Sequence, residues 1–103
     1  MSSYRLQFLP EAKAEWDRLD GSSRQQFAKV LLRRLSGPRV PAAALTAMPD
    51  CYKIKLRSAG FRLVYQVIDD KLLLLTIAVG RRDKSAVYDL ARLRMTAKNP
   101  GTP

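Results

Sequence analysis

The alternation of hydrophobic and polar residues divides the chain into a helical first part and an extended second part. In the first part, apolar side chains recur every three or four residues, which is the spacing of an amphipathic helix. The pattern predicts one helix over 10–19 and a second that begins at Ser22 or Ser23 and stops before Gly37. The Asp20-Gly21 pair is predicted to end the first helix. Two helices with so short a connection are expected to form an antiparallel hairpin that covers a sheet.

The second part of the chain has the period of two that is typical of strands. Three such segments follow one another closely, so we expect an antiparallel meander. Ser58-Ala59-Gly60 is expected to form a three-residue first loop in which Gly60 supplies a positive φ, and Asp69-Asp70 to form a two-residue second turn. A further short strand is predicted before the helices. The predicted strands cover 4–8, 52–57, 61–68 and 71–79, and the last is apolar on both faces, which predicts burial on both.

A final amphipathic segment predicts a C-terminal helix over 85–98, and 36–50 is predicted to be a long connecting loop. The expected fold class is therefore α+β, with two N-terminal helices packed on a mainly antiparallel sheet of about four strands, plus a C-terminal helix. The length of 103 residues suits one domain, predicted over 1–98, with a flexible tail at 99–103.

Composition excludes several classes of protein. Hydrophobic residues make up 47% of the chain and charged residues 27%, which argues against disorder over most of its length. The longest apolar run, 72–79, is much shorter than the roughly 20 residues that span a bilayer, and no signal-like segment opens the chain. With one cysteine, Cys51, and no histidine, we expect neither an internal disulfide nor a metal or cofactor, and a location in the reducing cytoplasm away from membranes.

The net charge of +10 makes polyanions the first class of partner to consider. The first 50 residues carry +3 of this charge and the remainder +7, so we expect the anion-facing surface in the second half. There the period of two places Lys53, Lys55 and Arg57 on one face of a strand, with Ile54 and Leu56 on the other. An ordinary solvated strand face would show the same pattern.

Four further residues could carry chemistry. Arg62 opens the neighbouring strand across a short turn, which makes it a close neighbour of the lysines. Arg81 and Arg82 follow Gly80 where the last strand ends, a place that often presents functional groups. Tyr88 falls in the first turns of the C-terminal helix, where it serves either as a half-buried helix residue or as a platform for a base.

Three segments together resemble the RelE toxins of bacterial toxin–antitoxin systems, within the RelE/ParE superfamily. They read MPDCYKIKLRS at 48–58, GFRLVYQVID at 60–69 and VGRR at 79–82, followed by Ser85 and the Val87-Tyr88 pair. The similarity runs in order from about Tyr4 to Met95. The resemblance implies the toxin of a type II system: a metal-independent endoribonuclease that enters the ribosomal A site, cuts the messenger there and inhibits translation.

By position in these motifs, the resemblance implies catalytic roles for Lys53, Lys55, Arg62, Arg82 and Tyr88, and we expect Arg57 and Arg81 to bind RNA. The implied reaction is attack of the RNA 2′-hydroxyl on the adjacent phosphate, which leaves a 2′,3′-cyclic phosphate and a free 5′-hydroxyl. Neighbouring cations lower the pKa of a lysine, so one lysine, Lys55 first, can act as general base. Alternatively both lysines stay charged and stabilise the transition state. Arg82 either donates the proton to the leaving oxygen or only stabilises it.

The resemblance also implies partners: messenger and ribosomal RNA, a cognate antitoxin, and operator DNA contacted by the toxin–antitoxin complex through the antitoxin. The chain departs from the family at Ala44 and Thr46, where family members of this type carry basic residues, which affects the expected contacts with ribosomal RNA. Two alternatives remain: a ParE-like toxin that inhibits gyrase, and a basic nucleic-acid-binding module without catalysis.

Overall fold

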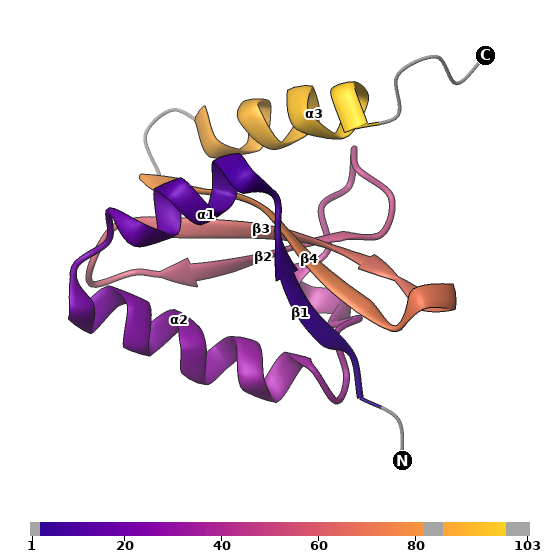
Figure 1. Cartoon of the computed structure of the whole chain (residues 1–103), viewed down its shortest axis with the longest axis horizontal. Helices are drawn as coiled ribbons and strands as arrows, with labels where there is room; N and C mark the ends of the chain where they lie inside the picture. Colours follow the sequence, from indigo (N-terminus) through magenta and orange to yellow (C-terminus); the bar gives the residue numbers. More distant parts are fainter. Residues whose placement is uncertain (1–2, 82–85, 99–103) are drawn as a thin grey trace.

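A four-stranded sheet lies between two helical layers in the computed structural model, which describes residues 3–81 and 86–98 (Figure 1). The predicted tail at 99–103 lies outside these residues. No helix of the described ranges is long and apolar enough to cross a membrane. The elements in chain order are β1 (Arg5–Phe8), α1 (Pro10–Asp17), α2 (Gly21–Arg34), the 3-10 turn η1 (Pro41–Ala43), β2 (Cys51–Leu56), β3 (Phe61–Ile68), the 3-10 turn η2 (Asp69–Lys71), β4 (Leu73–Arg81) and α3 (Ala86–Lys98).

The sheet has the strand order β1-β4-β3-β2. Strands β2, β3 and β4 form the predicted antiparallel meander, whereas β1 pairs with β4 in parallel. The α+β class is confirmed, and the description "mainly antiparallel" needs the correction that the sheet is mixed. Periodicity shows that 5–8 is a strand but carries no information on which neighbour it pairs with, so the direction of this pairing was not predictable.

The start of the second helix differs from the prediction. α2 begins at Gly21, and its N-cap is Asp20, whose side chain accepts hydrogen bonds from the Ser23 backbone N–H (3.1 Å) and the Ser23 hydroxyl (2.7 Å). The predicted caps Ser22 and Ser23 are therefore wrong, and Asp20-Gly21 opens α2 after α1 has already ended at Asp17. Aspartate caps as well as serine does, and its carboxylate here reaches the third backbone N–H of the helix.

The two turns of the meander have different outcomes. Gly60 has the expected positive φ of 72°, but the predicted three-residue loop at 58–60 is wrong, because β2 ends at Leu56 and the connection occupies 57–60. The two-residue turn at Asp69-Asp70 is wrong: these residues begin η2, and Leu72 follows with a left-handed φ of 49°. β4 consequently begins at Leu73, two residues later than predicted.

Each face of the sheet has its own hydrophobic core. Phe27 and Leu31 of α2 pack with Ile54 and Leu63 on one face, and Val87 and Ala91 of α3 pack with Val64 and Ala78 on the other. Figure 1 shows α2 and α3 on opposite sides of the sheet. β4 is buried from Leu73 through Val79, which confirms the prediction that both of its faces are covered.

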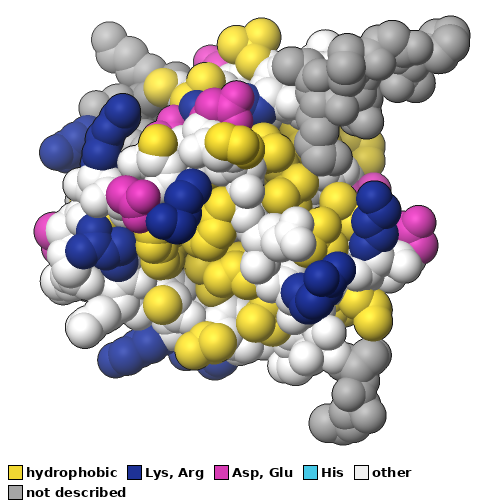
Figure 2. Space-filling view, viewed as in Figure 1, with side chains coloured by type: hydrophobic (Ala, Val, Ile, Leu, Met, Phe, Trp, Pro, Cys, Tyr) yellow, Lys and Arg dark blue, Asp and Glu magenta, His cyan; other side chains and the backbone are white. Residues whose placement is uncertain are grey.

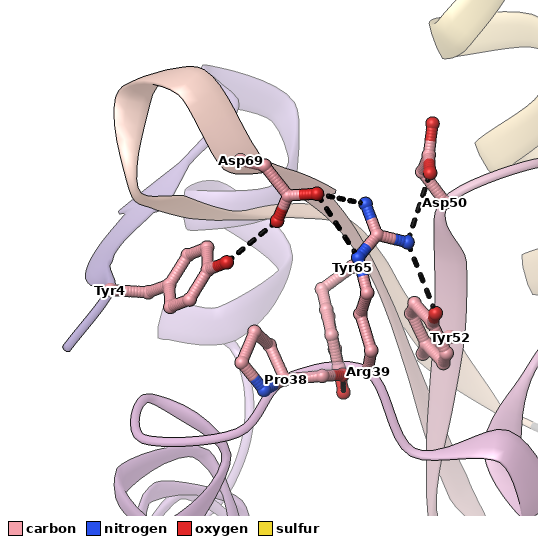
Figure 3. Close-up of polar contacts among 7 residues, drawn as sticks. All are labelled: Tyr4, Pro38, Arg39, Asp50, Tyr52, Tyr65 and Asp69. Carbon is pink, nitrogen blue, oxygen red and sulfur yellow. Dashed lines mark hydrogen bonds and ion pairs between the residues drawn. The ribbon is translucent and has the colours of Figure 1, made fainter. Parts of the chain in front are cut away.

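Arg39 ties the predicted loop 36–50 to the sheet (Figure 3). Its guanidinium forms ion pairs with Asp69 (2.7 Å) and Asp50 (3.0 Å) and donates a hydrogen bond to the Tyr52 hydroxyl (3.3 Å). Tyr4 donates a hydrogen bond of 2.6 Å to the same Asp69 carboxylate. This network joins the start of β1, the loop, the start of β2 and the β3–β4 turn.

Tyr65 provides a second anchor for the loop. Its buried hydroxyl donates to the Pro38 carbonyl (2.7 Å) and accepts from Arg34 at the end of α2 (2.8 Å). Its ring stacks on Tyr52 with 5.6 Å between centroids. The chain leaving α2 is thus fixed beside β2, where the basic stripe begins.

Candidate functional site

Lys55 and Arg62 lie directly opposite each other on β2 and β3. The side chains of such cross-strand pairs share one face of a sheet, with Cβ atoms about 5 Å apart. Lys53 pairs with Val64, one step along the same face. The structure therefore brings together three of the residues that the sequence singled out.

Burial of the opposite face fixes the direction of these cations. Ile54 and Leu56 are 3% and 7% exposed within the core beneath β2, whereas Lys53 is half-buried and Lys55 is exposed. A one-residue slip of β2 would place both lysines in that core, so the hydrophobic pattern specifies the register. The predicted separation of the two faces is confirmed.

A hollow of about 270 Å³ runs beside β2, the edge strand of the sheet. Arg57 lines it from the turn after β2, so the structure places this predicted RNA-binding residue next to the lysines. Arg34 also lines it and was not singled out from the sequence, because a basic residue in the last turn of a helix is common for reasons of helix stability. The full lining is Arg34, Val40, Ala42, Ala43, Lys53, Lys55 and Arg57.

The neighbouring positive charges lower the pKa of Lys55 below the usual lysine value. Arg62 is the largest cause, followed by desolvation and then by the charges of Lys53 and Arg57. Each of these effects disfavours the protonated ammonium. The shift increases the fraction of neutral amine, which is the form that can accept a proton.

Tyr88 reaches this group of cations from α3. Its hydroxyl accepts a hydrogen bond from Arg62 at 3.5 Å, and its ring is half-buried. Arg62 also pairs across the sheet with Gly80, and a Cβ at Gly80 would lie 3.8 Å from the Val87 side chain. The start of α3 therefore lies against the end of β4, which explains why Tyr88 and Arg62 meet.

A second hollow, of about 320 Å³, lies between 45–48 and α3, beside Tyr88. Thr46, one of the two departures from the family pattern, lines it together with Asp89 and Arg92 of α3. Ala44, the other departure, forms a single antiparallel bridge with Tyr52 at the start of β2. Ala44 therefore lies beside the strand that carries the basic stripe, and Thr46 lies in the hollow beside Tyr88.

Of the two arginines predicted at the end of β4, the structure describes only Arg81. Arg81 pairs with Phe61, and its guanidinium lies 5.2 Å from the centroid of the Phe61 ring. Phe61 packs in the core under α1 and α2, on the opposite face from Arg62. The structure therefore does not bring Arg81 to the Lys55–Arg62 pair, and Arg82 lies outside the described residues.

An ion pair between α1 and α3 was missed from the sequence. Arg94 donates to both carboxylate oxygens of Glu15, at 2.8 and 2.7 Å, and to the Ile77 carbonyl at 3.0 Å. Glu15 also accepts the Val79 backbone N–H at 3.0 Å. The sequence did contain one indication that Arg94 is buried: it follows Val87 by seven residues and so lies on the helix face that carries the buried residues.

The arrangement is suited to holding a phosphate diester. Two lysines and two arginines supply positive charge, and Tyr88 supplies an aromatic face and a hydroxyl beside them. Among residues 3–81 and 86–98, no three His, Cys, Asp or Glu side chains gather where they could hold a metal. On the face of the molecule seen in Figure 2, Lys and Arg side chains are scattered around a central hydrophobic area, so the charge is not gathered into one patch there.

Comparisons with known proteins agree on one group of relatives. Residues 6–86 match the family described as "ParE toxin of type II toxin-antitoxin system, parDE". The mRNA interferase toxin RelE of Escherichia coli (strain K12) is 50% identical over 93 residues, which cover 90% of this chain and 98% of that protein. The mRNA interferase RelE of Shigella flexneri has the same identity and coverage.

Solved structures of the same toxin have the same fold. A mutant of the E. coli toxin RelE in the free state gives a TM-score of 0.85 at 47% identity, covering 93% of this chain and all of that chain. A chain of the intact E. coli RelBE toxin–antitoxin complex gives 0.77 at 49% identity, covering 80% of this chain and all of that chain.

Proposed function

Because the chain belongs to the RelE-type toxins of the RelE/ParE superfamily, we propose that it is the toxin of a type II toxin–antitoxin system and cleaves messenger RNA in the ribosomal A site. The observation that carries this proposal is the Lys55–Arg62 pair, with Lys53 and Tyr88 beside it. The proposed site of action is the cytoplasm, where ribosomes translate.

The proposed reaction is the one that the resemblance to the RelE toxins implies. The 2′-hydroxyl of a ribose attacks the adjacent phosphorus, and the bond from phosphorus to the 5′-oxygen breaks. The products are a 2′,3′-cyclic phosphate and a free 5′-hydroxyl. The protein has to remove the hydroxyl proton, hold the reacting oxygens in line and stabilise the extra negative charge.

Lys55 is the first candidate for the general base. The cations around it lower its pKa, which raises the concentration of the free amine at neutral pH. A bound phosphate acts in the opposite direction, because an anion stabilises the ammonium. The second candidate role is electrostatic, with Lys53 and Lys55 both charged and holding the attacking hydroxyl and phosphate in place.

Arg62 is suited to the phosphate oxygens, because a guanidinium binds two oxygens at once and keeps its proton. For the same reason Arg82 is a poor proton donor, so stabilisation of the leaving oxygen is its simpler role. Tyr88 stacks on a base, a contact worth about 1–3 kcal/mol. Arg57 and Arg81 contribute to RNA binding outside the chemical step.

A ParE-like action on gyrase is not favoured, because relatives at 50% identity are mRNA interferases even though the matched family is described by the ParE toxin. The proposed protein partner is an antitoxin, supported by the RelBE complex among similar structures. Its toxin-binding segment is expected to be acidic or amphipathic, given the +10 charge of this chain. Operator DNA is proposed to bind the complex through the antitoxin.

The proposal is tested by mapping messenger ends on purified ribosomes stopped at a known codon, with and without the protein. New ends inside the A-site codon are expected with the wild type, and none on the same messenger without ribosomes. The Arg62→Ala variant serves as the catalytic control. Intact messenger on ribosomes that have an open A site would contradict the proposal.

A further inference from the structure

The ion pair between Glu15 and Arg94 connects three elements, α1, α3 and β4, and α3 is the helix that carries Tyr88. Glu15 belongs to α1 and Arg94 to α3, and both contact the backbone of β4 at Val79 and Ile77. Their side chains are 17% and 14% exposed, so water competes little for these contacts. A bidentate pair of this kind is much better defined geometrically than the exposed ion pairs of the surface.

The contacts on β4 fall where this strand has β3 on one side but no longer has β1 on the other. β1 pairs with β4 only as far as Thr76, after which the chain turns into α1. The N–H of Val79 and the carbonyl of Ile77 lie beyond this point, and Glu15 and Arg94 provide their partners. Ile77 is also the extra residue of a bulge, because Val64 pairs with Ala78 and Tyr65 with Thr76.

The rest of α3 is held by apolar contacts on one side. Val87 and Ala91 are 2% and 0% exposed, and Arg94 continues the same face one turn later. A helix rises 1.5 Å per residue, so Arg94 fixes α3 about 9 Å along its axis from Tyr88. With apolar contacts alone, α3 can tilt or rotate on the sheet, since such contacts have no directional preference.

We propose that Glu15 and Arg94 are positioning residues for cleavage, because their ion pair fixes the orientation of α3 and thereby holds Tyr88 beside Arg62. The single contact between Tyr88 and Arg62, at 3.5 Å, is too long to fix the helix by itself. This inference rests on the proposed function, in which Tyr88 contacts the RNA. It assigns a role in catalysis to two residues that do not touch the substrate.

A double-mutant cycle tests this role. Arg94→Met is expected to lower the single-turnover rate on saturating ribosomes about fivefold, with little change in the ribosome concentration that gives half the maximal rate. In a Tyr88→Ala background, the same substitution is expected to change the rate less than twofold, because Tyr88 is no longer there to be positioned. Equal factors in both backgrounds, or an unchanged rate in the first, would overturn the proposal.

Arg92→Met is the matched control, because Arg92 lies on the same helix, is 55% exposed and pairs only loosely with Asp89, at 3.5 Å. It should leave the single-turnover rate within twofold. Arg94→Lys keeps the charge but cannot form the planar fork, so it should restore part of the rate. If Arg94→Met does not fold, the same double-mutant cycle with Tyr88→Ala is measured with Glu15→Gln and with Arg94→Lys.

Amide exchange of residues 86–96 separates failure of the inference from failure of the proposed function. Exchange is expected to be faster in Arg94→Met than in Arg92→Met, whether or not either protein cleaves messenger. If the wild type does not cleave messenger but Arg94→Met still exchanges faster than Arg92→Met, the proposed function is contradicted. The ion pair would in that case still be the anchor of α3. Equal exchange in the two variants would overturn the positioning role itself.

Discussion

Lys55 and Arg62 face each other across β2 and β3, and the positive charge of Arg62 is the largest cause of the lowered pKa of Lys55. In the proposed mechanism the lysine and the arginine act on the same phosphate from neighbouring strands, and the charge of Arg62 favours the neutral amine of Lys55. This relationship gives the proposed mechanism a pH dependence that can be measured.

If Lys55 is the general base, the single-turnover rate should rise with pH from 6 towards 9, until the amine is fully deprotonated. Arg62→Ala removes the largest cause of the lowered pKa, so the remaining activity should rise at higher pH than in the wild type. The measurement is the rate on saturating ribosomes at each pH. A flat profile would instead support the role in which both lysines stay charged.

Substitution of Arg62 and Arg81 should separate the two faces of the sheet. Arg62→Ala and Arg82→Ala are each expected to lower the cleavage rate at least tenfold without unfolding the protein. Arg81→Ala is the matched control, because Arg81 lies over Phe61 on the opposite face, and it should affect the bound-state rate less than twofold. Comparable losses for Arg81→Ala and Arg62→Ala would contradict the assignment of faces.

Arg57→Ala should weaken RNA binding and spare the chemical step. Arg57 is exposed in the turn after β2, at the end of the hollow that the lysines line. Each lost phosphate contact should reduce the dependence of log affinity on log salt by about 0.7. The measurement is the apparent affinity at several salt concentrations, together with the rate at saturation. Abolished cleavage at saturating ribosomes would show that Arg57 takes part in the chemistry.

Asp69 should contribute to stability in a pH-dependent way. The hydrogen bond from Tyr4 is the largest cause of its lowered pKa, followed by the bond from Arg39. Because its folded pKa lies below the unfolded value near 3.9, the contribution is present above about pH 4 and is lost as the pH falls through the folded value.

Thermal unfolding from pH 6 to pH 2.5 checks this contribution. The midpoint of the wild type should fall more steeply below pH 4 than that of Asp69→Asn, which has no carboxylate to protonate at this position. Asp70→Asn, the exposed neighbour, is the matched control and should follow the wild type. Parallel curves for the wild type and Asp69→Asn would contradict a role of the Tyr4–Asp69–Arg39 contacts in stability.

The predicted three-residue loop at 58–60 would place Leu63 opposite Lys55, whereas the connection at 57–60 places Arg62 there. That Arg62 lies close to the lysines was nevertheless predictable from the sequence, because a short turn joins two clearly alternating strands. The neighbour of Arg62 on β4 was not. A two-residue turn at 69–70 would place Ile77 opposite Arg62, whereas η2 and the bulge place Gly80 there. A shift of this kind depends on tertiary packing, and alternation within one strand does not encode it.

The Glu15–Arg94 pair was hidden for a different reason. Its two residues are 79 positions apart, and each is typical of a helix surface when considered alone. The contact exists because β1 ends early and leaves part of the β4 edge without a neighbouring strand, which is a property of the assembled sheet. The capping of α2 by Asp20, by contrast, was a local choice between equally good candidates.

The most direct test of the account uses ribosome-bound messenger that carries a single 2′-deoxynucleotide on the 5′ side of the mapped cleavage position. The proposed reaction needs that 2′-hydroxyl as its nucleophile, so cleavage there should fall at least a hundredfold while the protein still binds the ribosome. The unmodified messenger should yield a 2′,3′-cyclic phosphate and a 5′-hydroxyl. Cleavage of the deoxy-substituted messenger at an unchanged rate would contradict the mechanism.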